Sequence, residues 1–402
     1  MKRWEALEIF GRLRSDVIVV YGPGGLSSEL DAKSPSELNI YSPMPYPTSF
    51  GLGLALALPT RKVVVMEGDG SVLSGLTALP TLATVGPRNL VNVVWDNGTW
   101  FSSGTMGTKA HYGPVPAPTA VRTDLAAHAK ASGCDRVFTV QTLDEFESVL
   151  RPALAEEAPC YIVAKVEQTA MPGVTTKQIG TVEEAVNFRR ALIKRKWVGA
   201  AHAGVSQGKW LAAEERSSPL TIPEVKIVKE SGPRPSLEKA RIIYSSLREA
   251  GIDFVVYVPD SANYLIQRFA REDKNITSVA ATREDDALAM AMGAFMGGRN
   301  PVAIMEASGL GLCPLALAIL SHEQRLGTLI VYSHNFALGE VRSSHACTRW
   351  IADPLFDALM IPHMTLTNIK DAPFMIKQAW RTVRGQMCPV AISLPLDVIW
   401  DE

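Results

Sequence analysis

The sequence predicts an α/β fold made of two related parallel-sheet domains, and three observations predict it. First, runs of β-branched residues alternate along the whole chain with glycine or polar turns and helix-like segments, the pattern of parallel strands joined by crossover helices. Second, the 402 residues, 47% hydrophobic and 20% charged, suffice for two sizeable globular cores. Third, the expected strands fall into two series with similar spacing.

Each series contains four strands. The first comprises residues 17–21, 62–67, 90–95 and 161–166, and the second comprises residues 254–258, 302–306, 328–333 and 390–394. The strands start 45, 28 and 71 residues apart in the first series and 48, 26 and 62 residues apart in the second. This long-period self-similarity suggests duplicated domains.

A segment rich in serine, proline and charge separates the two series. We expect residues 206–239 to be a linker, because they show no sustained apolar period. The first domain then covers residues 1–205 and the second covers residues 240–402. Residues 181–196 have acidic residues in their first turn and basic residues in their last, so we expect a helix that closes the first domain.

Composition and charge exclude several classes of protein. Forty Lys and Arg residues balance 41 Asp and Glu, so neither nucleic acid nor anionic lipid is an expected partner, and a small molecule is. Five cysteines without a CxxC pair indicate a reducing cytoplasm. Residues 1–16 suit a surface helix better than a signal peptide. Residues 301–320 approach the length of a membrane span, but a glutamate, a proline and glycines divide them.

The end of the second strand carries the most informative motif. The segment RKVVVMEGDGS places Gly68, Asp69, Gly70 and Ser71 between an apolar strand and a helix expected to begin near Val72. The glycines would let the backbone approach a ligand, the helix N-terminus would face an anion, and Asp69 would supply a carboxylate for Mg²⁺. A simple strand-to-helix turn is the alternative.

The next strand ends in a second polar group, DNGT at residues 96–99, with 26 residues between Gly70 and Asn97. Neighbouring parallel strands would put these two ends side by side. The amide oxygen of Asn97 and the carbonyl oxygen of Thr99 can then join Asp69 around one Mg²⁺. Diphosphate oxygens and water would complete the octahedral shell.

These motifs resemble those of thiamine-diphosphate-dependent enzymes. The GDG triplet followed by Asn97 is similar to their diphosphate-binding motif. The segment TREDDALAMAMGAFMG is similar to their pyrimidine-domain motif, in which a glutamate, here Glu284, precedes an alanine-rich helix. The resemblance implies that Glu284 bonds the aminopyrimidine ring of the cofactor. A carboxyl that burial keeps protonated can hydrogen-bond the ring nitrogen. The alternative is that Glu284 merely begins a helix, where acidic residues suit the helix dipole.

Within this superfamily the chain resembles the sulfopyruvate and phosphonopyruvate decarboxylases. The residues that carry this resemblance are VPDS at 258–261, TRE at 282–284, ASGLG at 307–311 and SH at 333–334. In sulfopyruvate decarboxylases the two domains are often separate subunits, whereas here they are expected to be fused. The diphosphate-binding domain comes first, and no middle domain is expected.

The resemblance also implies less specific site residues. Met44 occupies the position where relatives bend the cofactor with a bulky apolar side chain, although ordinary core packing explains a methionine equally well. Ser308, Gly309 and Leu310 would pass close to the pyrimidine, or would simply form a glycine turn before a helix. His334, at a strand end, could meet substrate or move protons, and so could His111 and His345; a structural role is the alternative.

The chain departs from these relatives near the expected substrate. Asn335, Phe336 and Ala337 follow His334, where an arginine and a glycine are common, and Trp100 and Phe101 add aromatic bulk. A sulfonate or phosphonate needs fixed cations. Candidates are Arg342, Arg283 and Lys109. The departures leave room for a less charged or aromatic 2-oxo acid.

The resulting hypothesis is a Mg²⁺- and thiamine-diphosphate-dependent 2-oxo acid decarboxylase that forms a homodimer or homotetramer with sites between chains. A carboligase of the acetolactate-synthase type is the first alternative. A nicotinamide or flavin oxidoreductase that uses residues 22–25 (GPGG) is another, although this stretch lacks the GxGxxG fingerprint. A binding module without catalysis is the last. The sequence leaves open the identity of the 2-oxo acid and the roles of His111, His345 and Arg342.

Overall fold

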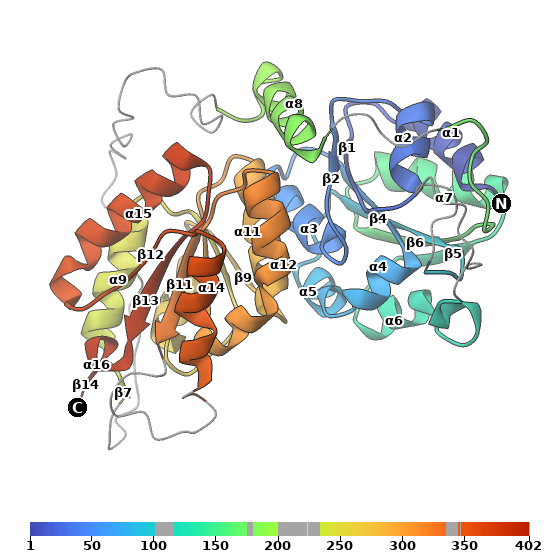
Figure 1. Ribbon diagram of the computed structural model, residues 1–402. Helices are drawn as coiled ribbons and strands as arrows, with labels where there is room; N and C mark the ends of the chain where they lie inside the picture. The colour runs from blue at the N-terminus through green and yellow to red at the C-terminus, as the bar shows by residue number, and fades with distance from the viewer. Residues whose placement is uncertain are drawn as a thin grey trace. The chain divides into compact units, whose positions relative to one another are not determined.

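The structure is a computed structural model that describes residues 1–100, 116–174, 180–199, 223, 234–334, 345 and 347–401. The chain divides into two compact units, Met1–Trp197 and Val198–Glu402, called here the first and second units. Most of the predicted linker, 206–239, lies outside the described residues. Helix α9 (Leu237–Glu249) begins two residues before the predicted end of this linker at residue 239. Each unit is described by itself (Figure 1).

The first unit is built on a six-stranded sheet in the order β2-β1-β3-β4-β6-β5, in which every neighbouring pair is parallel. Its strands are β1 (Ile18–Tyr21), β2 (Asn39–Tyr41), β3 (Val63–Gly68), β4 (Leu90–Asp96), β5 (Val137–Val140) and β6 (Cys160–Lys165). The central strands are buried on both faces, as expected for a parallel sheet covered by helices on each side.

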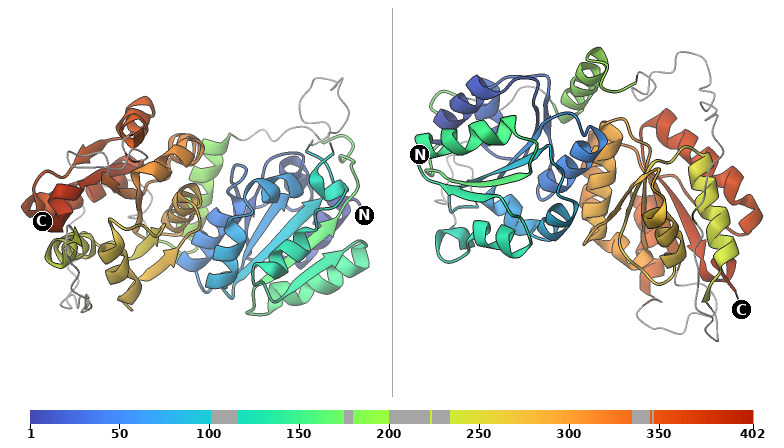
Figure 2. Two further views of the ribbon diagram at one scale, coloured as in Figure 1. Left: turned by 90° about the horizontal axis from the view of Figure 1, so that it is seen from below. Right: turned by 180° about the vertical axis from the view of Figure 1, so that it is seen from behind.

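Helices cover both faces of this sheet (Figure 2). They are α1 (Arg3–Leu13), α2 (Leu26–Lys33), α3 (Pro47–Ala57), α4 (Asp69–Ser74), α5 (Ala78–Val85), α6 (Leu125–Ala131), α7 (Leu143–Ala155), α8 (Thr181–Lys194) and the 3₁₀ turn η1 (Pro118–Ala120). The main core lies between the sheet and α1, α2 and α7. On the opposite face Gly51 lets α3 contact Val65, because a side chain there would overlap the valine. Helix α7 starts at a capping box formed by Thr142 and Glu145.

The second unit repeats the topology of the first. Its sheet has the order β12-β13-β11-β10-β8-β9, the same arrangement when the strands are numbered within each unit, and its neighbours are parallel. Its strands are β8 (Phe254–Tyr257), β9 (Thr277–Ala280), β10 (Pro301–Glu306), β11 (Leu329–His334), β12 (His363–Thr365) and β13 (Val390–Pro395). A short antiparallel pair, β7 (Arg234–Pro235) and β14 (Trp400–Asp401), lies beside it. The shared order fits the predicted duplication.

Helix α11 of the second unit follows directly from its composition. Alanine, glycine and methionine fill it, and nearly all of its residues are buried, because small side chains allow a helix to pack closely against a sheet. The other helices are α9, α10 (Tyr264–Glu272), α12 (Pro314–Ala316), α14 (Ala352–Ala358), α15 (Ala372–Gln386) and α16 (Leu396–Ile399), with 3₁₀ turns η3 (Ala307–Leu312), η5 (Cys347–Trp350) and η6 (Ile369–Asp371) and the π-helix η4 (Leu317–Glu323).

The predicted strands are confirmed to within about two residues at their ends, as is normal for strand limits. The four edge strands, β2, β5, β9 and β12, were not predicted, because they are short and most of them are partly exposed. The prediction of a helix starting near Val72 was wrong, since α4 begins at Asp69. In the part of the chain that the structure describes, no helix has the length and apolar character of a membrane span.

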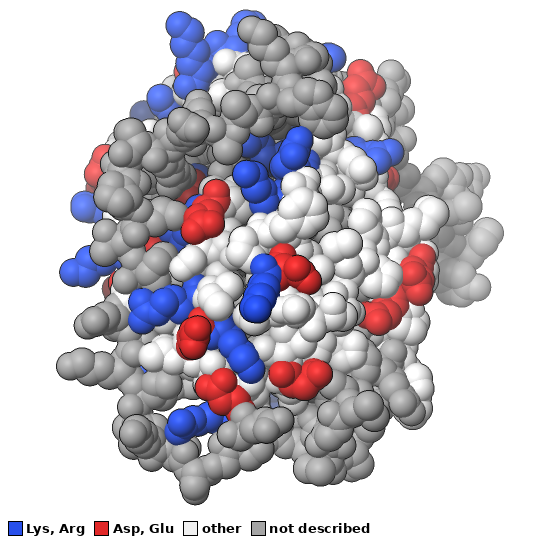
Figure 3. Space-filling model, turned by 90° about the vertical axis from the view of Figure 1, so that its left-hand side faces the viewer, with Lys and Arg blue, Asp and Glu red and all other residues white. Residues whose placement is uncertain are grey.

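The surface of the second unit in Figure 3 carries both signs of charge interspersed with uncharged side chains. This face matches the balanced composition, with a formal net charge of -1. The side chains that the structure describes on this face form no single-sign field of the kind that attracts a polyanion.

Candidate functional site

The carboxyl ends of β3 and β4 lie side by side, as predicted. In the parallel register of these strands Gly68 faces Trp95, so Asp69 and the turn of residues 97–99 follow at the same edge. Asp69 is the first residue of α4 and is buried. Asn97 and Thr99 leave β4 in a turn in which Gly98 has φ +69°, a conformation that favours glycine. The structure therefore brings together all three residues predicted to bind the metal.

Hydrogen bonds fix the side chains of this cluster. The Thr119 hydroxyl, from η1, donates to Oδ2 of Asp69 at 2.6 Å. Asn97 Oδ1 accepts from the backbone N–H of Thr99 at 2.9 Å and from its hydroxyl at 3.0 Å. Thr119 was not among the predicted site residues, because its contact with Asp69 depends on a chain return 50 residues later.

The electrostatics at this edge favour a cation. Burial raises the pKa of Asp69 to about 6; the hydrogen bond from Thr119 opposes the shift, and the nearby carboxylate of Asp96 adds to it. Asp96 is also buried, and Lys165 makes an ion pair with it. Two buried carboxylates with one lysine leave an excess negative charge that a divalent ion would balance.

The oxygen atoms available at this edge fit the ligand preference of Mg²⁺. Asp69, Asn97 and Thr99 would offer a carboxylate, an amide and a backbone carbonyl, all hard oxygen ligands. Among the described residues no group of three or more His, Cys, Asp or Glu side chains could hold a metal. In the proposed set, the amide oxygen of Asn97 and the carbonyl oxygen of Thr99 would join the carboxylate of Asp69, and diphosphate and water would supply the rest.

A buried glutamate that the sequence analysis did not single out ties this motif to α3. Glu67, which is 2% exposed, accepts from the hydroxyl of Ser71 in α4 at 2.6 Å and from that of Thr48 in α3 at 2.5 Å. Asn92 donates in turn to Thr48 at 2.9 Å. Buried carboxylates need such donors, so this network fixes the turn that carries Asp69. Ser71, predicted to contact the cofactor, contacts Glu67 here.

The glycines of the motif have different surroundings. A Cβ on Gly68 would meet nothing within 4 Å, whereas a Cβ on Gly70 would lie 2.8 Å from the indole ring of Trp100. Trp100 is 45% exposed and lies against the turn. The indole ring of Trp100 is therefore located against the backbone of Gly70, which is expected to approach the diphosphate.

Met44 follows β2 and leads into α3. Its side chain is 39% exposed, so ordinary core packing does not explain it. The adjacent Pro45 contacts Gly75 at the end of α4, where a Cβ would lie 2.7 Å from the proline carbonyl oxygen. The Met44 loop thus packs against the helix that begins at Asp69.

In the second unit Glu284 begins α11 and lies against η3. Its carboxyl group packs on the backbone of Gly309, where any side chain would overlap it. The two segments were predicted separately from the sequence, and the structure brings them into contact. The glycine is required here because the carboxyl occupies the space of a Cβ.

Burial raises the pKa of Glu284, and the neighbouring carboxylates of Asp285 and Glu306 add to the shift. Asp285 itself is held by both oxygens through Arg283, at 3.0 Å each. The guanidinium of Arg283 is therefore engaged by a carboxylate, which weakens its claim as the cation for a sulfonate or phosphonate.

The remaining predicted residues of the second unit differ in accessibility. Ser308 is exposed and Leu310 is fully buried, so only the former offers its side chain to a ligand. His334 ends β11 and its Nδ1 lies 2.5 Å from the hydroxyl of Ser393. Burial lowers the pKa of His334, and the nearby Asp353 and Asp397 oppose the shift. An imidazole with a lowered pKa at a strand end suits proton transfer or substrate contact.

His345 lies at the same edge of the second sheet, 3.4 Å from Oε1 of Glu306 at the end of β10. Several other residues considered in the sequence lie outside the described residues; these are Phe101, Lys109, His111, Asn335, Phe336, Ala337 and Arg342.

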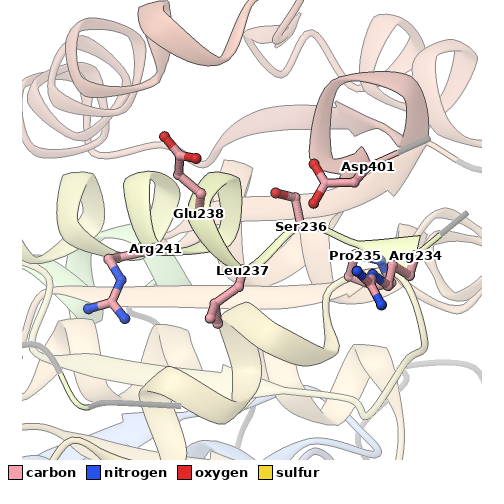
Figure 4. Close-up of a pocket in the computed structure, with 7 residues that line it drawn as sticks. All are labelled: Arg234, Pro235, Ser236, Leu237, Glu238, Arg241 and Asp401. Carbon is pink, nitrogen blue, oxygen red and sulfur yellow. The ribbon is translucent and has the colours of Figure 1, made fainter. Parts of the chain in front are cut away.

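A pocket of about 400 Å³ opens at the start of α9 (Figure 4). Its lining residues are Arg234, Pro235, Ser236, Leu237, Glu238, Arg241 and Asp401. None of them belongs to the predicted site, and basic and acidic side chains line the pocket together.

Comparison with known proteins supports the cofactor. Residues 30–164, within the first unit, match the family model for the C-terminal TPP binding domain of thiamine pyrophosphate enzymes. Over its whole length the chain also resembles solved structures. Benzoylformate decarboxylase from Polynucleobacter necessarius has a TM-score of 0.56 at 12% identity, with 98% of each chain covered. Transketolase from Leishmania mexicana has a TM-score of 0.55 at 11% identity, with 98% of this chain and 70% of that one covered. At such identities the likeness concerns the fold.

Relatives are closer in sequence. Phosphonopyruvate decarboxylase of Streptomyces viridochromogenes is 34% identical over 208 residues, 50% of this chain and 49% of that protein, so the chain spans about half the length of this relative. The beta subunit of sulfopyruvate decarboxylase of Methanocaldococcus jannaschii is 37% identical over 37% of this chain and 74% of the subunit. The alpha subunit from the same organism is 32% identical over 37% of this chain and 89% of the subunit. The chain therefore belongs to the family of thiamine-diphosphate-dependent enzymes that includes the sulfopyruvate and phosphonopyruvate decarboxylases.

Proposed function

We propose that the chain is a Mg²⁺- and thiamine-diphosphate-dependent decarboxylase that converts a 2-oxo acid into an aldehyde and CO₂. The observation that carries the proposal is the oxygen cluster at the carboxyl edge of the first sheet, where Asp69 lies beside the turn of residues 97–99. Relatives named for the decarboxylation of phosphonopyruvate and sulfopyruvate support the reaction type.

In this proposal the residues of each unit have a distinct task. Asp69, Asn97 and Thr99 would hold Mg²⁺, which would neutralise the diphosphate. Glu284, whose pKa burial raises, would hold a proton and hydrogen-bond the pyrimidine ring. His334 contacts the substrate at its strand end. Bound thiamine diphosphate supplies the electron sink that the loss of CO₂ requires.

The substrate proposal is a sulfopyruvate-like or phosphonopyruvate-like acid, with a less charged or aromatic 2-oxo acid as the alternative. The contact of Trp100 with Gly70 and the pairing of Arg283 with Asp285 favour the alternative. Both features reduce the space or the free cationic charge that a second anionic group would need.

The other two classes of enzyme make different products or need a different site. A carboligase would convert the same 2-oxo acid into a 2-hydroxy ketone. An oxidoreductase would need an open backbone at residues 22–25. These residues (GPGG) lack the GxGxxG fingerprint of a dinucleotide-binding turn, which speaks against an oxidoreductase of this kind.

The test is product analysis. The purified chain is incubated with thiamine diphosphate, Mg²⁺ and a panel of sulfopyruvate, phosphonopyruvate, pyruvate and benzoylformate, with EDTA in the control. We expect one of these acids to give equal amounts of CO₂ and aldehyde, and EDTA to stop the reaction. CO₂ accompanied by a 2-hydroxy ketone would indicate the carboligase. No turnover of any acid, with no cofactor-dependent rise in melting temperature, would contradict the proposal.

We also propose a homodimer, or a tetramer built from two dimers, in which each site takes Asp69 from one chain and Glu284 from another. Mixing inactive Asp69→Ala and Glu284→Gln chains then rebuilds one intact site in each mixed dimer. Random exchange should restore about a quarter of wild-type activity. If both residues of a site come from one chain, the mixture stays inactive.

A further inference from the structure

A second carboxylate occupies the metal-binding edge of the first unit. Asp96, the last residue of β4, is registered directly opposite Lys165, the last residue of β6. Its carboxylate is 2% exposed, and Oδ2 forms an ion pair with the Lys165 ammonium, whose side chain is 40% exposed. The lysine thus reaches from the surface to a buried acid, so the pair is built by the strand register rather than by loop contacts.

The other oxygen of Asp96 is also used. Oδ1 accepts from the backbone N–H of Gly98 at 3.2 Å. A side chain that bonds the N–H two residues ahead is a turn of the Asx type, which local sequence favours for aspartate and asparagine. Asn97 repeats the same bond to the N–H of Thr99 at 2.9 Å. Two overlapping turns therefore fix the residues proposed as Mg²⁺ ligands.

The fold holds the same turn from its other side. The carbonyl oxygen of Gly98 accepts from the N–H of Ala117 at 2.8 Å, and Thr99 bridges to Pro116. With Asp96 on the N–H of Gly98, both backbone groups of this glycine are bonded. Because its φ is +69°, Gly98 sets the direction in which the chain leaves β4. Loss of the bond from Asp96 would leave the turn held from one side.

We infer that Asp96 and Lys165 form a positioning pair for the Mg²⁺ turn: Asp96 orients the turn through the N–H of Gly98, and Lys165 supplies the counter-charge that a buried carboxylate needs. The inference rests on the proposed function, because it concerns residues that hold the cation of the cofactor. Neither residue is among the proposed ligands of the cation. The pair acts on Asn97 and Thr99 through the backbone.

Two double variants separate the hydrogen bond from the charge. Asp96→Asn with Lys165→Met removes both charges but keeps an oxygen acceptor for the N–H of Gly98. Asp96→Leu with Lys165→Met removes both charges and the acceptor. Neither variant leaves an unpaired buried ion, so both should fold, and urea unfolding without metal checks this. Glu156→Ala, which breaks the Arg136 ion pair elsewhere in the first unit, is the control.

The probe is Mn²⁺, whose binding in the presence of thiamine diphosphate is followed by electron paramagnetic resonance. We expect the Leu–Met variant to bind Mn²⁺ about 10- to 100-fold more weakly than wild type, as for other residues that orient metal ligands. The Asn–Met variant and Glu156→Ala should stay within about threefold of wild type, well below that range.

Three results would overturn the inference. Wild-type affinity in both double variants would show that the pair does not position the turn. Equal loss in both would show that the charges of the pair, rather than the bond of Asp96 to Gly98, matter. If the Leu–Met variant does not fold, a loss of Mn²⁺ affinity above about tenfold in the Asn–Met variant alone would also show that the charges, rather than the bond to Gly98, matter. In all three cases wild type still binds Mn²⁺ with the cofactor. If it does not, the proposed function fails as well.

Discussion

The carboxyl edges of the two sheets have the same topology but treat their acidic residues differently. At the first edge Asp69 receives a hydroxyl hydrogen bond and lies near Asp96, which a lysine partners. At the second edge the carboxyl of Glu284 packs against the backbone of Gly309, with the carboxylates of Asp285 and Glu306 nearby. Burial raises the pKa of both Asp69 and Glu284.

The two edges differ in what would offset the unfavourable burial of a carboxylate. A divalent ion at the first edge would restore the ionised form of Asp69, because opposite charge favours the carboxylate. At the second edge the proposed function assigns a proton to Glu284 instead, because burial and the carboxylates of Asp285 and Glu306 raise its pKa. Under the proposed function, one duplicated framework would provide a cation site in one unit and a hydrogen-bond donor in the other. The predictions below test whether these two roles can be separated.

The largest effect is expected at the first edge. Asp69→Ala removes the only carboxylate among the proposed Mg²⁺ ligands, so the rise in melting temperature caused by thiamine diphosphate with Mg²⁺ should disappear. Turnover should fall by more than about 100-fold, because loss of a residue that only orients a metal ligand already costs up to about 100-fold. Differential scanning fluorimetry and the aldehyde assay measure both. Asp135→Ala, at an exposed aspartate of the same unit, is the control and should retain both.

The second effect separates catalysis from binding. Glu284→Gln should keep much of the cofactor-dependent melting shift, because an amide can still hydrogen-bond the ring. Turnover should fall by about 10²- to 10⁴-fold, since the exchangeable proton is lost. Glu238→Gln changes another glutamate in the first turn of a helix and should leave turnover intact. Equal, small effects of both substitutions would support the simple helix-start interpretation of Glu284.

The third effect concerns the glycine under Glu284. Gly309→Ala places a methyl group where the carboxyl now lies, so one of them must move. We expect a loss of about 1–3 kcal/mol in the free energy of unfolding, the usual cost of overpacking, together with reduced turnover. Gly311→Ala is the matched control, because its Cβ would meet Ile351 at an ordinary 3.6 Å. Urea unfolding compares the two, and similar stabilities would contradict the close contact.

The smallest effect on stability is expected at Met44. Because this side chain is 39% exposed, Met44→Ala should change the free energy of unfolding by less than about 1 kcal/mol, while turnover falls if the side chain bends the cofactor. Met66→Ala, at a fully buried methionine of β3, should cost about 2–5 kcal/mol. A large stability loss in Met44→Ala would favour a packing role instead.

Features that depend on neighbouring residues could be predicted from the sequence, and features that depend on distant residues could not. The inner strands of both sheets were predicted because they are continuous apolar runs, whereas β5 and β9 escaped detection because half or more of their residues are not buried. Asp69 and Asn97 were found as a pair because parallel neighbouring strands end at one edge. Thr119 and Lys165 were not, since their contacts join segments 50 and 69 residues apart.

The sequence by itself determined the two-domain α/β architecture, the order of the motifs and the residue types that a divalent ion and a pyrimidine ring require. These properties are local, because apolar runs and glycine turns act within a few residues. Only the tertiary structure decided that Gly309 lies under Glu284, that Glu67 links two segments through buried hydroxyls, and that Asp96 is paired with Lys165. Burial and strand register create these contacts. Both bring together residues that are distant in the chain, so the local sequence does not reveal them.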